Sequence, residues 1–289
     1  MNHMKIDLHI HTSTGSDGAL PMNEVFRVAK KRDIDFLSIT DHDSIEHQGK
    51  AIELAAANHL RYITGVELNV TFPHQGKAIS LDFLGYGYDY ENNALKEKLR
   101  LIREHREKRA RQIIDNLNAE FKRENRPLFT DKDLRKMQAG VDGILSRPHI
   151  ADYLIKKEIV SNRQEAFDRY LVKCDVPKYP LPPDEAAELI RGAGGRLVFA
   201  HPNDPNGTSL TGVTKNLTEQ TTIIEKNMLK HIDGVECWHS RNDAATTKHY
   251  IEFCKKQNIL MTGGSDCHQK PILMGTVEVA EMVAGEFIK

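Results

Sequence analysis

Alternation of apolar and polar residues marks the first strand that the sequence predicts. In residues 5–14, KIDLHIHTST, every second residue from Ile6 to Ile10 is apolar, which is the two-residue period of a β-strand. His9 and His11 then point to the same side, about 6.5 Å apart at about 3.3 Å per residue. Both imidazoles can reach one metal ion at that spacing. An isolated pair of this kind is as often two incidental surface histidines as a metal-binding pair, so the choice between them depends on the rest of the chain.

The hydrophobic pattern predicts a regular succession of strands and helices on both sides of a long helical stretch. Before residue 90, strands are expected at 35–40, 61–70 and 79–89, with helices after Pro21 and at 44–58. After residue 180, helices are expected at 184–195 and 242–258, and strands at 196–200, 232–238 and 259–268. Strands that alternate with helices in this way imply parallel pairing through right-handed crossovers.

The middle of the chain predicts helices only. Residues 91–124 contain no glycine or proline and carry an apolar stripe, which indicates one long helix. Arg106 and Arg109 fall on that stripe, so each needs an anionic partner, either a carboxylate or a phosphate. Shorter helices are expected at 131–138, 147–158 and 163–172. We therefore expect a helical subdomain, 88–178, inserted between two parts of an α/β domain, 1–87 and 179–289.

Composition excludes several classes of protein. The formal net charge of −1 and the 39% hydrophobic content fit a globular protein without a strongly basic nucleic-acid surface. Four cysteines without CxxC spacing argue against a disulfide framework or a zinc ribbon and favour free thiols in a reducing compartment. No membrane span or targeting segment is recognisable. We expect a cytoplasmic protein without membrane association and without a stable protein partner.

Histidine or acidic residues follow several of the predicted strands at their carboxyl ends. They are His9 and His11, His42, Glu67, His201, and Asp266 with His268. In a barrel of parallel strands such positions converge on one face. So many ionisable groups facing one another would be costly without a counter-charge, and metal coordination is the simplest arrangement for them.

The order of short motifs adds a resemblance. HIH at 9–11, SDG, TDHD, GVE, AHP and GSDCH occur in the order found in the polymerase and histidinol phosphatase (PHP) domain family of metal-dependent phosphoesterases, over nearly the whole chain. The segment SRPHIADYLI resembles the subgroup with a helical insertion that acts on nucleotide phosphates. This resemblance implies a distorted (β/α)7 barrel with two or three divalent ions, either manganese, iron or zinc.

The resemblance also implies a role for individual residues. The first ion would be held by His9, His11, Glu67 and Asp266. Glu67 would bridge to a second ion that also takes His201, and a third would be held by Asp17, His42 and His268. Asp82 stands where many relatives have histidine, and a carboxylate there favours manganese or iron over zinc. His74 is an alternative ligand, and SDG around Asp17 is also a common turn sequence.

The implied reaction is hydrolysis of a phosphate ester by a metal-bridging hydroxide, because such ions activate water and neutralise phosphoryl charge. No nucleophile elbow or Walker loop is present. Arg147 and His149 are expected to bind phosphate from a lid, with Arg106 and Arg109 as further candidates. Otherwise, Arg147 pairs with a local acid and His149 caps a helix.

Three other residues carry alternative assignments. His268 is a candidate catalytic acid near the leaving group. Asp41 is expected to orient His42, although Asp41 and Asp43 would also suit the cap of the helix that follows. His239 could line the pocket or lie on the surface.

The favoured function is a phosphoesterase acting on a nucleotide, a nucleoside bisphosphate or a short oligonucleotide. Residues 94–126 hold 11 Lys+Arg against 6 Asp+Glu, enough to bind a few phosphates. The alternatives are a phosphatase of the histidinol-phosphate type and a non-catalytic, metal-stabilised accessory domain.

Overall fold

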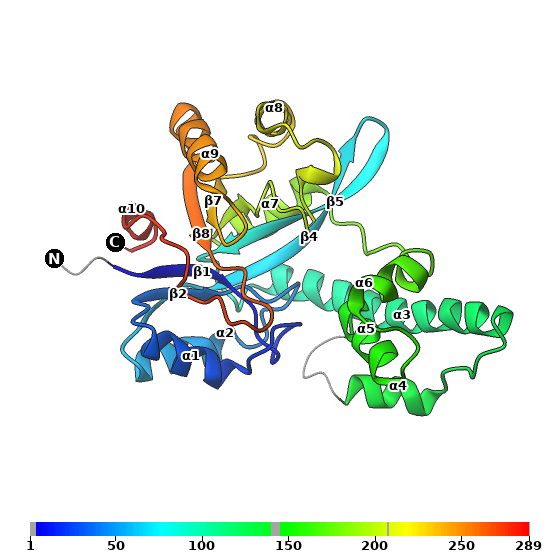
Figure 1. Ribbon diagram of the computed structural model, residues 1–289. Helices are drawn as coiled ribbons and strands as arrows, with labels where there is room; N and C mark the ends of the chain where they lie inside the picture. The colour runs from blue at the N-terminus through cyan, green and yellow to red at the C-terminus, as the bar shows by residue number, and fades with distance from the viewer. Residues whose placement is uncertain (1–3, 140–144, 207, 289) are drawn as a thin grey trace.

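Eight strands and ten α-helices make up the part of the chain that the computed structural model describes, residues 4–139, 145–206 and 208–288 (Figure 1). The strands are β1 (Ile6–Ile10), β2 (Phe36–Ile39), β3 (Arg61–Tyr62), β4 (Gly65–His74), β5 (Lys77–Tyr86), β6 (Arg196–Phe199), β7 (Gly234–His239) and β8 (Leu260–Gly264). The helices are α1 (Met22–Lys31), α2 (Gln48–Ala57), α3 (Asn93–Arg123), α4 (Asp131–Gln138), α5 (Arg147–Lys156), α6 (Arg163–Ala166), α7 (Pro183–Gly192), α8 (Leu217–Asn227), α9 (Ala244–Gln257) and α10 (Met282–Gly285). A π-helical turn, Phe167–Leu171, continues α6, and a short 3-10 turn spans Leu210–Gly212.

The strands form two sheets, so a single closed barrel is not found among the described residues. One sheet has the order β1-β2-β3 and is parallel, and the other has the order β4-β5-β6-β7-β8. The predicted strand at 61–70 is divided between them, into β3 and β4. Two isolated bridges join the sheets, Ile10 to Cys267 and His42 to Glu67. The fold is therefore mixed α/β, as expected, with two linked sheets in place of the expected closed barrel.

The expectation of parallel pairing throughout was wrong for β4 and β5. These strands form an antiparallel hairpin, and β5 is also antiparallel to β6. Gln75 and Gly76 make the connecting two-residue turn with φ values of 48° and 76°, as a type I′ turn requires. No helix fits into so short a connection, and the strands return directly on themselves. From β6 to β8 the pairing is parallel, as expected.

Strand β1 lies against β8 at a point where a glycine allows close approach. A Cβ on Gly264 would lie 2.3 Å from the backbone nitrogen of His9, far inside van der Waals contact. The carboxyl ends of β1 and β8 consequently meet, and the backbone N–H of Asp266 donates to the carbonyl of His9 at 2.8 Å. This contact brings two ends of the chain, separated by more than 250 residues, to one place.

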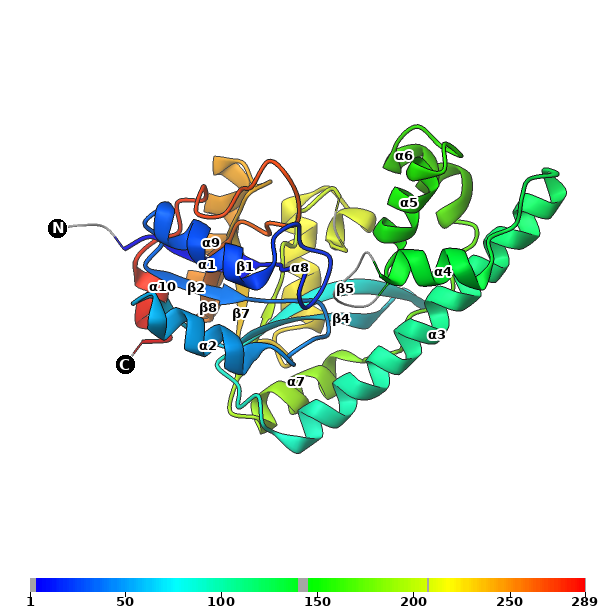
Figure 2. The ribbon, with the colours of Figure 1, turned by 90° about the horizontal axis from the view of Figure 1, so that it is seen from below.

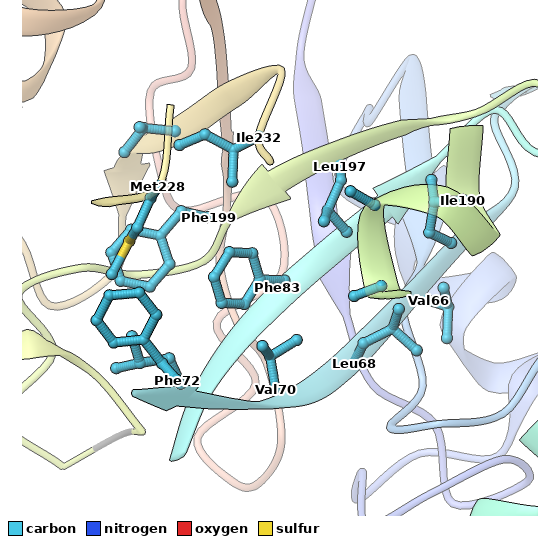
Figure 3. Packing of buried hydrophobic residues seen from close by; sticks show 14 of the residues in the cluster. Val66, Leu68, Val70, Phe72, Phe83, Ile190, Leu197, Phe199, Met228 and Ile232 are labelled. Atoms are coloured by element: carbon cyan, nitrogen blue, oxygen red, sulfur yellow. The ribbon is translucent and has the colours of Figure 1, made fainter. Parts of the chain in front are cut away.

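The main core fills the space between the larger sheet and its covering helices. Figure 3 shows Val66, Leu68 and Val70 on the same face of β4, next to Phe83. The rings of Phe83 and Phe199 lie 5.1 Å apart. Burial of these side chains stabilises the sheet by about 25 cal/mol per Å² of apolar surface. The packed core also keeps the strands that carry the candidate histidine and carboxylate residues rigid.

Helix α3 links the two lobes of the molecule. Figure 2 shows it running from α7 to the lobe of α4, α5 and α6. Leu95, Leu99 and Ile102 pack into the main core, whereas Ile113, Leu117 and several further residues belong to a separate core of the helical lobe. The helical insertion is present, as expected, and the first turns of its longest helix are built into the α/β lobe. Helices α8 and α10 were not predicted.

Candidate functional site

The predicted histidine and carboxylate residues gather at one place, within or just beyond strands from both sheets. Their ligand atoms form three groups, within each of which all atoms lie within 4.8 Å of one another. The groups are His9, His11, Glu67 and Asp266; Glu67, Asp82 and His201; and His11, Asp17, His42 and His268. Glu67 and His11 each belong to two groups, so the three are continuous.

The first group has the donor atoms of a metal site, and two of its carboxylate oxygens accept no hydrogen bond from the described residues. His9 Nδ1 lies 3.0 Å from Glu236 Oε1, so its Nε2 faces inward, 3.1 Å from His11 Nε2. Glu67 Oε2 and Asp266 Oδ1 are buried and accept no hydrogen bond from the described residues. Buried carboxylate oxygens are costly unless paired. A divalent ion between these nitrogens and oxygens would satisfy all of them, so the residues present fit a metal.

Glu67 connects the first group to the second. Its Oε1 lies 2.9 Å from His201 Nε2, and its Oε2 lies 3.1 Å from both His11 Nε2 and His42 Nδ1. Asp82, on the facing strand β5, is buried and accepts a hydrogen bond of 2.6 Å from Asn69 Nδ2. One carboxylate oriented with each oxygen toward different imidazoles is suited to bridging two ions.

The third group lies nearer the surface. His268 Nε2 is 3.5 Å from Asp17 Oδ1 and 3.4 Å from His42 Nε2. Its other nitrogen, Nδ1, lies 3.1 Å from Asp266 Oδ1. Asp266 has a φ of 50° and His201 a φ of 26°. Left-handed backbone is uncommon outside glycine and concentrates at functional sites.

Mutual proximity shifts the pKa values of these groups strongly. Burial alone would lower the pKa of His201 and of His268, but Glu67 raises the pKa of His201 to about 9. Asp266 and Asp17 likewise raise the pKa of His268 to about 10. Burial raises the pKa of Glu67, yet His42 and His9 outweigh it and hold that pKa well below its usual range. The ionised form is thus favoured for Glu67, Asp17 and Asp266, which suits them to holding cations, whereas burial and the nearby Glu67 raise the pKa of Asp82.

Three expected residues lie in other surroundings. The carboxylate of Asp41 accepts hydrogen bonds from Thr12 and Ser16 and not from His42, so it fixes the loop after β1. Neither Asp41 nor Asp43 caps α2, which begins at Gln48. His74 lies at the far end of β4, seven residues beyond Glu67, and belongs to none of the groups.

His239 is buried at the end of β7, which excludes the surface alternative. Its Nε2 lies 3.3 Å from Asp266 Oδ2. With Asp204 and Asp266 it forms a fourth group of possible ligand atoms. Asp204 was not singled out in the sequence.

A cavity of about 700 Å³ opens above the three groups, between the two lobes. It is lined by basic side chains from both lobes: Arg106, Arg109, Arg147, Arg163, Lys178 and Arg241. Arg106 Nη1 donates to Asp43 Oδ2 at 2.8 Å and to the His42 carbonyl at 3.1 Å. A cavity of this size and charge suits an anionic ligand as large as a nucleotide.

The contacts of Arg147 and His149 match the alternatives given for them, pairing with an acidic residue and capping of a helix. Arg147 Nη1 donates to Asp175 Oδ2 at 2.7 Å, and Arg109 pairs with the other oxygen of Asp175. His149 Nδ1 accepts from the backbone N–H of Ser146 at the start of α5. Arg147 and His149 nevertheless line the cavity, so neither contact removes them from the reach of a ligand.

Three further residues at the site were not singled out in the sequence. Glu236 orients His9 and lies within the apolar strand GVECWH. A buried carboxylate needs a partner, so an acidic residue inside an apolar strand was the signal that could have identified it. Lys178 lines the cavity and has no hydrogen bond or ion pair within residues 4–139, 145–206 and 208–288. Arg241 lines the cavity as well. The latter two follow strand or helix ends without any motif.

Sites with several divalent ions under a basic cavity suit phosphate esters, because the ions and cations together neutralise phosphoryl charge. The fold and the site thus define a metal-dependent phosphoesterase. Residues 7–171 match the model of the PHP domain, and the chain belongs to that family. None of the helices in the described part of the chain is long and apolar enough to cross a membrane.

The chain is similar to proteins described as an exoribonuclease and as a nucleoside bisphosphate phosphatase. A 5'-3' exoribonuclease of Haemophilus influenzae is 33% identical over 205 residues, covering 68% of this chain and 69% of that protein. A 3',5'-nucleoside bisphosphate phosphatase of Chromobacterium violaceum is 31% identical over 214 residues, covering 68% and 66%. The structure of an amidohydrolase from the same organism, with bound sulfate and no metal, has a TM-score of 0.79 at 27% identity, covering 96% and 92%.

Proposed function

We propose that this protein hydrolyses a phosphate ester of a nucleotide, a nucleoside bisphosphate or a short oligoribonucleotide. The observation that carries the proposal is the pair of buried oxygens, Glu67 Oε2 and Asp266 Oδ1, which meet four histidine side chains without a hydrogen bond of their own. Relatives described as an exoribonuclease and as a bisphosphate phosphatase support the class of substrate.

Each of the three groups would hold one divalent ion, manganese, iron or zinc. When bound, such ions activate water for attack and neutralise the phosphoryl oxygens. His9, His11, Glu67 and Asp266 would hold the first ion, Glu67, Asp82 and His201 the second, and Asp17, His42 and His268 the third. The mixed oxygen and nitrogen set at the second position, with Asp82, favours manganese or iron.

The residues of this chain bind and orient the substrate. Arg147, His149 and Arg106 face the cavity from the helical lobe, where a guanidinium fork suits a phosphate. Lys178 adds an ammonium group that makes no hydrogen bond or ion pair with the described residues. Arg109 is engaged by Asp175 and the Val176 carbonyl, so we assign it to holding the lid together. We assign residues 1–87 and 179–289 to the α/β lobe and residues 88–178 to the helical lobe.

Activity on defined substrates tests the proposal. Manganese-loaded protein is assayed against mononucleotides, 3',5'-bisphosphates and short RNAs carrying a 5'-phosphate, with metal content measured on the same sample. We expect phosphate release from a bisphosphate or mononucleotide release from RNA. The double variant His9→Ala, His42→Ala should lose metal and activity together. Full activity in that variant would exclude the metal mechanism, and bound metal without hydrolysis of any ester would favour an accessory domain.

The assay also separates the two activities named for the relatives. An exoribonuclease must accept a chain that continues beyond the first nucleotide, whereas a bisphosphate phosphatase needs only a compact ligand. The cavity of about 700 Å³ accommodates a nucleotide. We propose that the monoester of a small bisphosphate is the better substrate, and a higher kcat/KM for RNA than for the bisphosphate would contradict this.

A further inference from the structure

Arg241 joins the ends of three neighbouring strands. It follows β7, and its Nη1 donates to Asp204, which follows β6, and to Asp266 Oδ2, which follows β8, at 3.1 Å. Asp204 is almost fully buried, whereas the side chain of Arg241 is 32% exposed and lines the cavity. The buried carboxylate thus anchors a guanidinium group that belongs to the cavity lining.

The guanidinium lies in the fourth group of possible ligand atoms, Asp204, His239 and Asp266. His239 Nδ1 accepts the backbone N–H of Arg241 at 3.3 Å. His239 Nε2 is then the protonated nitrogen and donates to Asp266 Oδ2. A protonated ring nitrogen cannot ligate a metal, and both carboxylates already face the arginine. The positive charge in this group comes from Arg241 in place of an ion.

These contacts also determine which oxygen of Asp266 faces the metal groups. His239 and Arg241 both donate to Oδ2, which leaves Oδ1 toward the imidazoles of His9 and His268 at 3.4 and 3.1 Å. A guanidinium group has five N–H donors, and Nη1 supplies two of them. The Nε and Nη2 groups of Arg241 make no hydrogen bond to any residue in the described ranges.

We propose that Arg241 binds the phosphoryl group of the substrate through these remaining donors while Nη1 holds Asp266 in place. The inference rests on the proposed function and adds a cation to the cavity lining. Arg241 would contact the substrate from the α/β lobe, whereas Arg106, Arg147 and Lys178 lie in residues 88–178, the helical lobe. Hydrogen bonds to an ionised group typically contribute enough to change binding about 10- to 100-fold.

Binding of inorganic phosphate to manganese-loaded protein tests this without turnover. Isothermal titration calorimetry compares the wild type with Arg241→Lys, Arg241→Ala and the control Arg27→Ala, a surface arginine on α1. The lysine keeps a cation between the two carboxylates but lacks the Nε and Nη2 donors that would bind the phosphate. We expect Arg241→Lys to retain the wild-type metal content and to bind phosphate about 10- to 100-fold more weakly, with Arg27→Ala unchanged.

Two results would overturn the assignment. Arg241→Lys or Arg241→Ala, folded by circular dichroism, could bind phosphate as tightly as the wild type, which would exclude the contact. Loss of metal from Arg241→Lys would assign Arg241 only to holding Asp266. If phosphate binding depends on Arg241 while no ester is hydrolysed, the proposed function fails and this inference stands. With an active substrate, kcat for Arg241→Lys should fall on the order of 100-fold.

Discussion

His9 Nδ1 lies 3.0 Å from Glu236 Oε1, and both side chains are fully buried. The carboxylate accepts a hydrogen bond from Nδ1–H, which directs Nε2 toward Glu67 and Asp266. The second oxygen of Glu236 accepts the backbone N–H of His201 at 2.8 Å. One carboxylate outside the metal groups therefore orients residues of two of them.

Replacement of Glu236 should weaken metal binding without removing a ligand. In Glu236→Gln, the amide nitrogen cannot accept the second of the two hydrogen bonds, so either His9 or the loop at His201 loses its support. We expect metal affinity to fall about 10- to 100-fold, measured by competition with a chelator of known affinity. Unchanged affinity would show that the packing of the strands alone orients His9.

Replacement of Lys178 should affect substrates with a second phosphate most. Burial lowers the pKa of its ammonium group, while Asp82 and Asp43 favour the charged form. We expect Lys178→Met to raise KM for a 3',5'-bisphosphate about 10- to 100-fold, and to change KM for a monophosphate much less. Steady-state kinetics with both substrates measures this. Lys248→Met on α9, 76% exposed, is the matched control. An equal rise for both substrates would place Lys178 at the reacting phosphate.

Replacement of Asp82 should remove one ion selectively. Asp82 contributes to the group with Glu67 and His201 only, so Asp82→Ala is expected to lose that ion and to retain the others. Asp82→His keeps a nitrogen donor and should retain metal, with a shift in preference toward zinc. Elemental analysis of the purified variants gives the stoichiometry. A complete loss of metal from Asp82→Ala would mean that the three groups bind cooperatively.

Metal binding should release protons and strengthen as the pH rises. The pKa values of His201, about 9, and of His268, about 10, lie above the ordinary 6.5, so both imidazoles are protonated near neutral pH in the metal-free protein. An ion must displace these protons, and affinity should increase about tenfold per pH unit for each proton displaced. Calorimetry in buffers of different ionisation enthalpy counts them. Affinity that falls as the pH rises would contradict the assignment.

Much of the site was predictable because its residues carry local signals. The alternation around His9 and His11 fixes their common side, and His42 and His201 follow apolar runs that are strands in the structure. Glu67 was expected at the carboxyl end of a strand, but it lies near the amino end of β4. Glu236 and Arg241 escaped prediction because they contact residues distant in sequence, and Lys178 because no motif surrounds it. Arg106 was expected to need an anion, and it meets Asp43, 63 residues away.

The sequence by itself determined most of the elements and most of the candidate ligands, because periodicity and chemistry are local properties of the chain. It did not determine that β4 and β5 turn back on themselves, nor that the strands divide into two sheets, since pairing depends on which edges meet during packing. Only the tertiary structure decided that Asp175 engages both Arg109 and Arg147, and that a guanidinium group lies between Asp204 and Asp266. These are interactions between distant parts of the chain, whose energies depend on distance and burial, and both quantities exist only once the chain is folded.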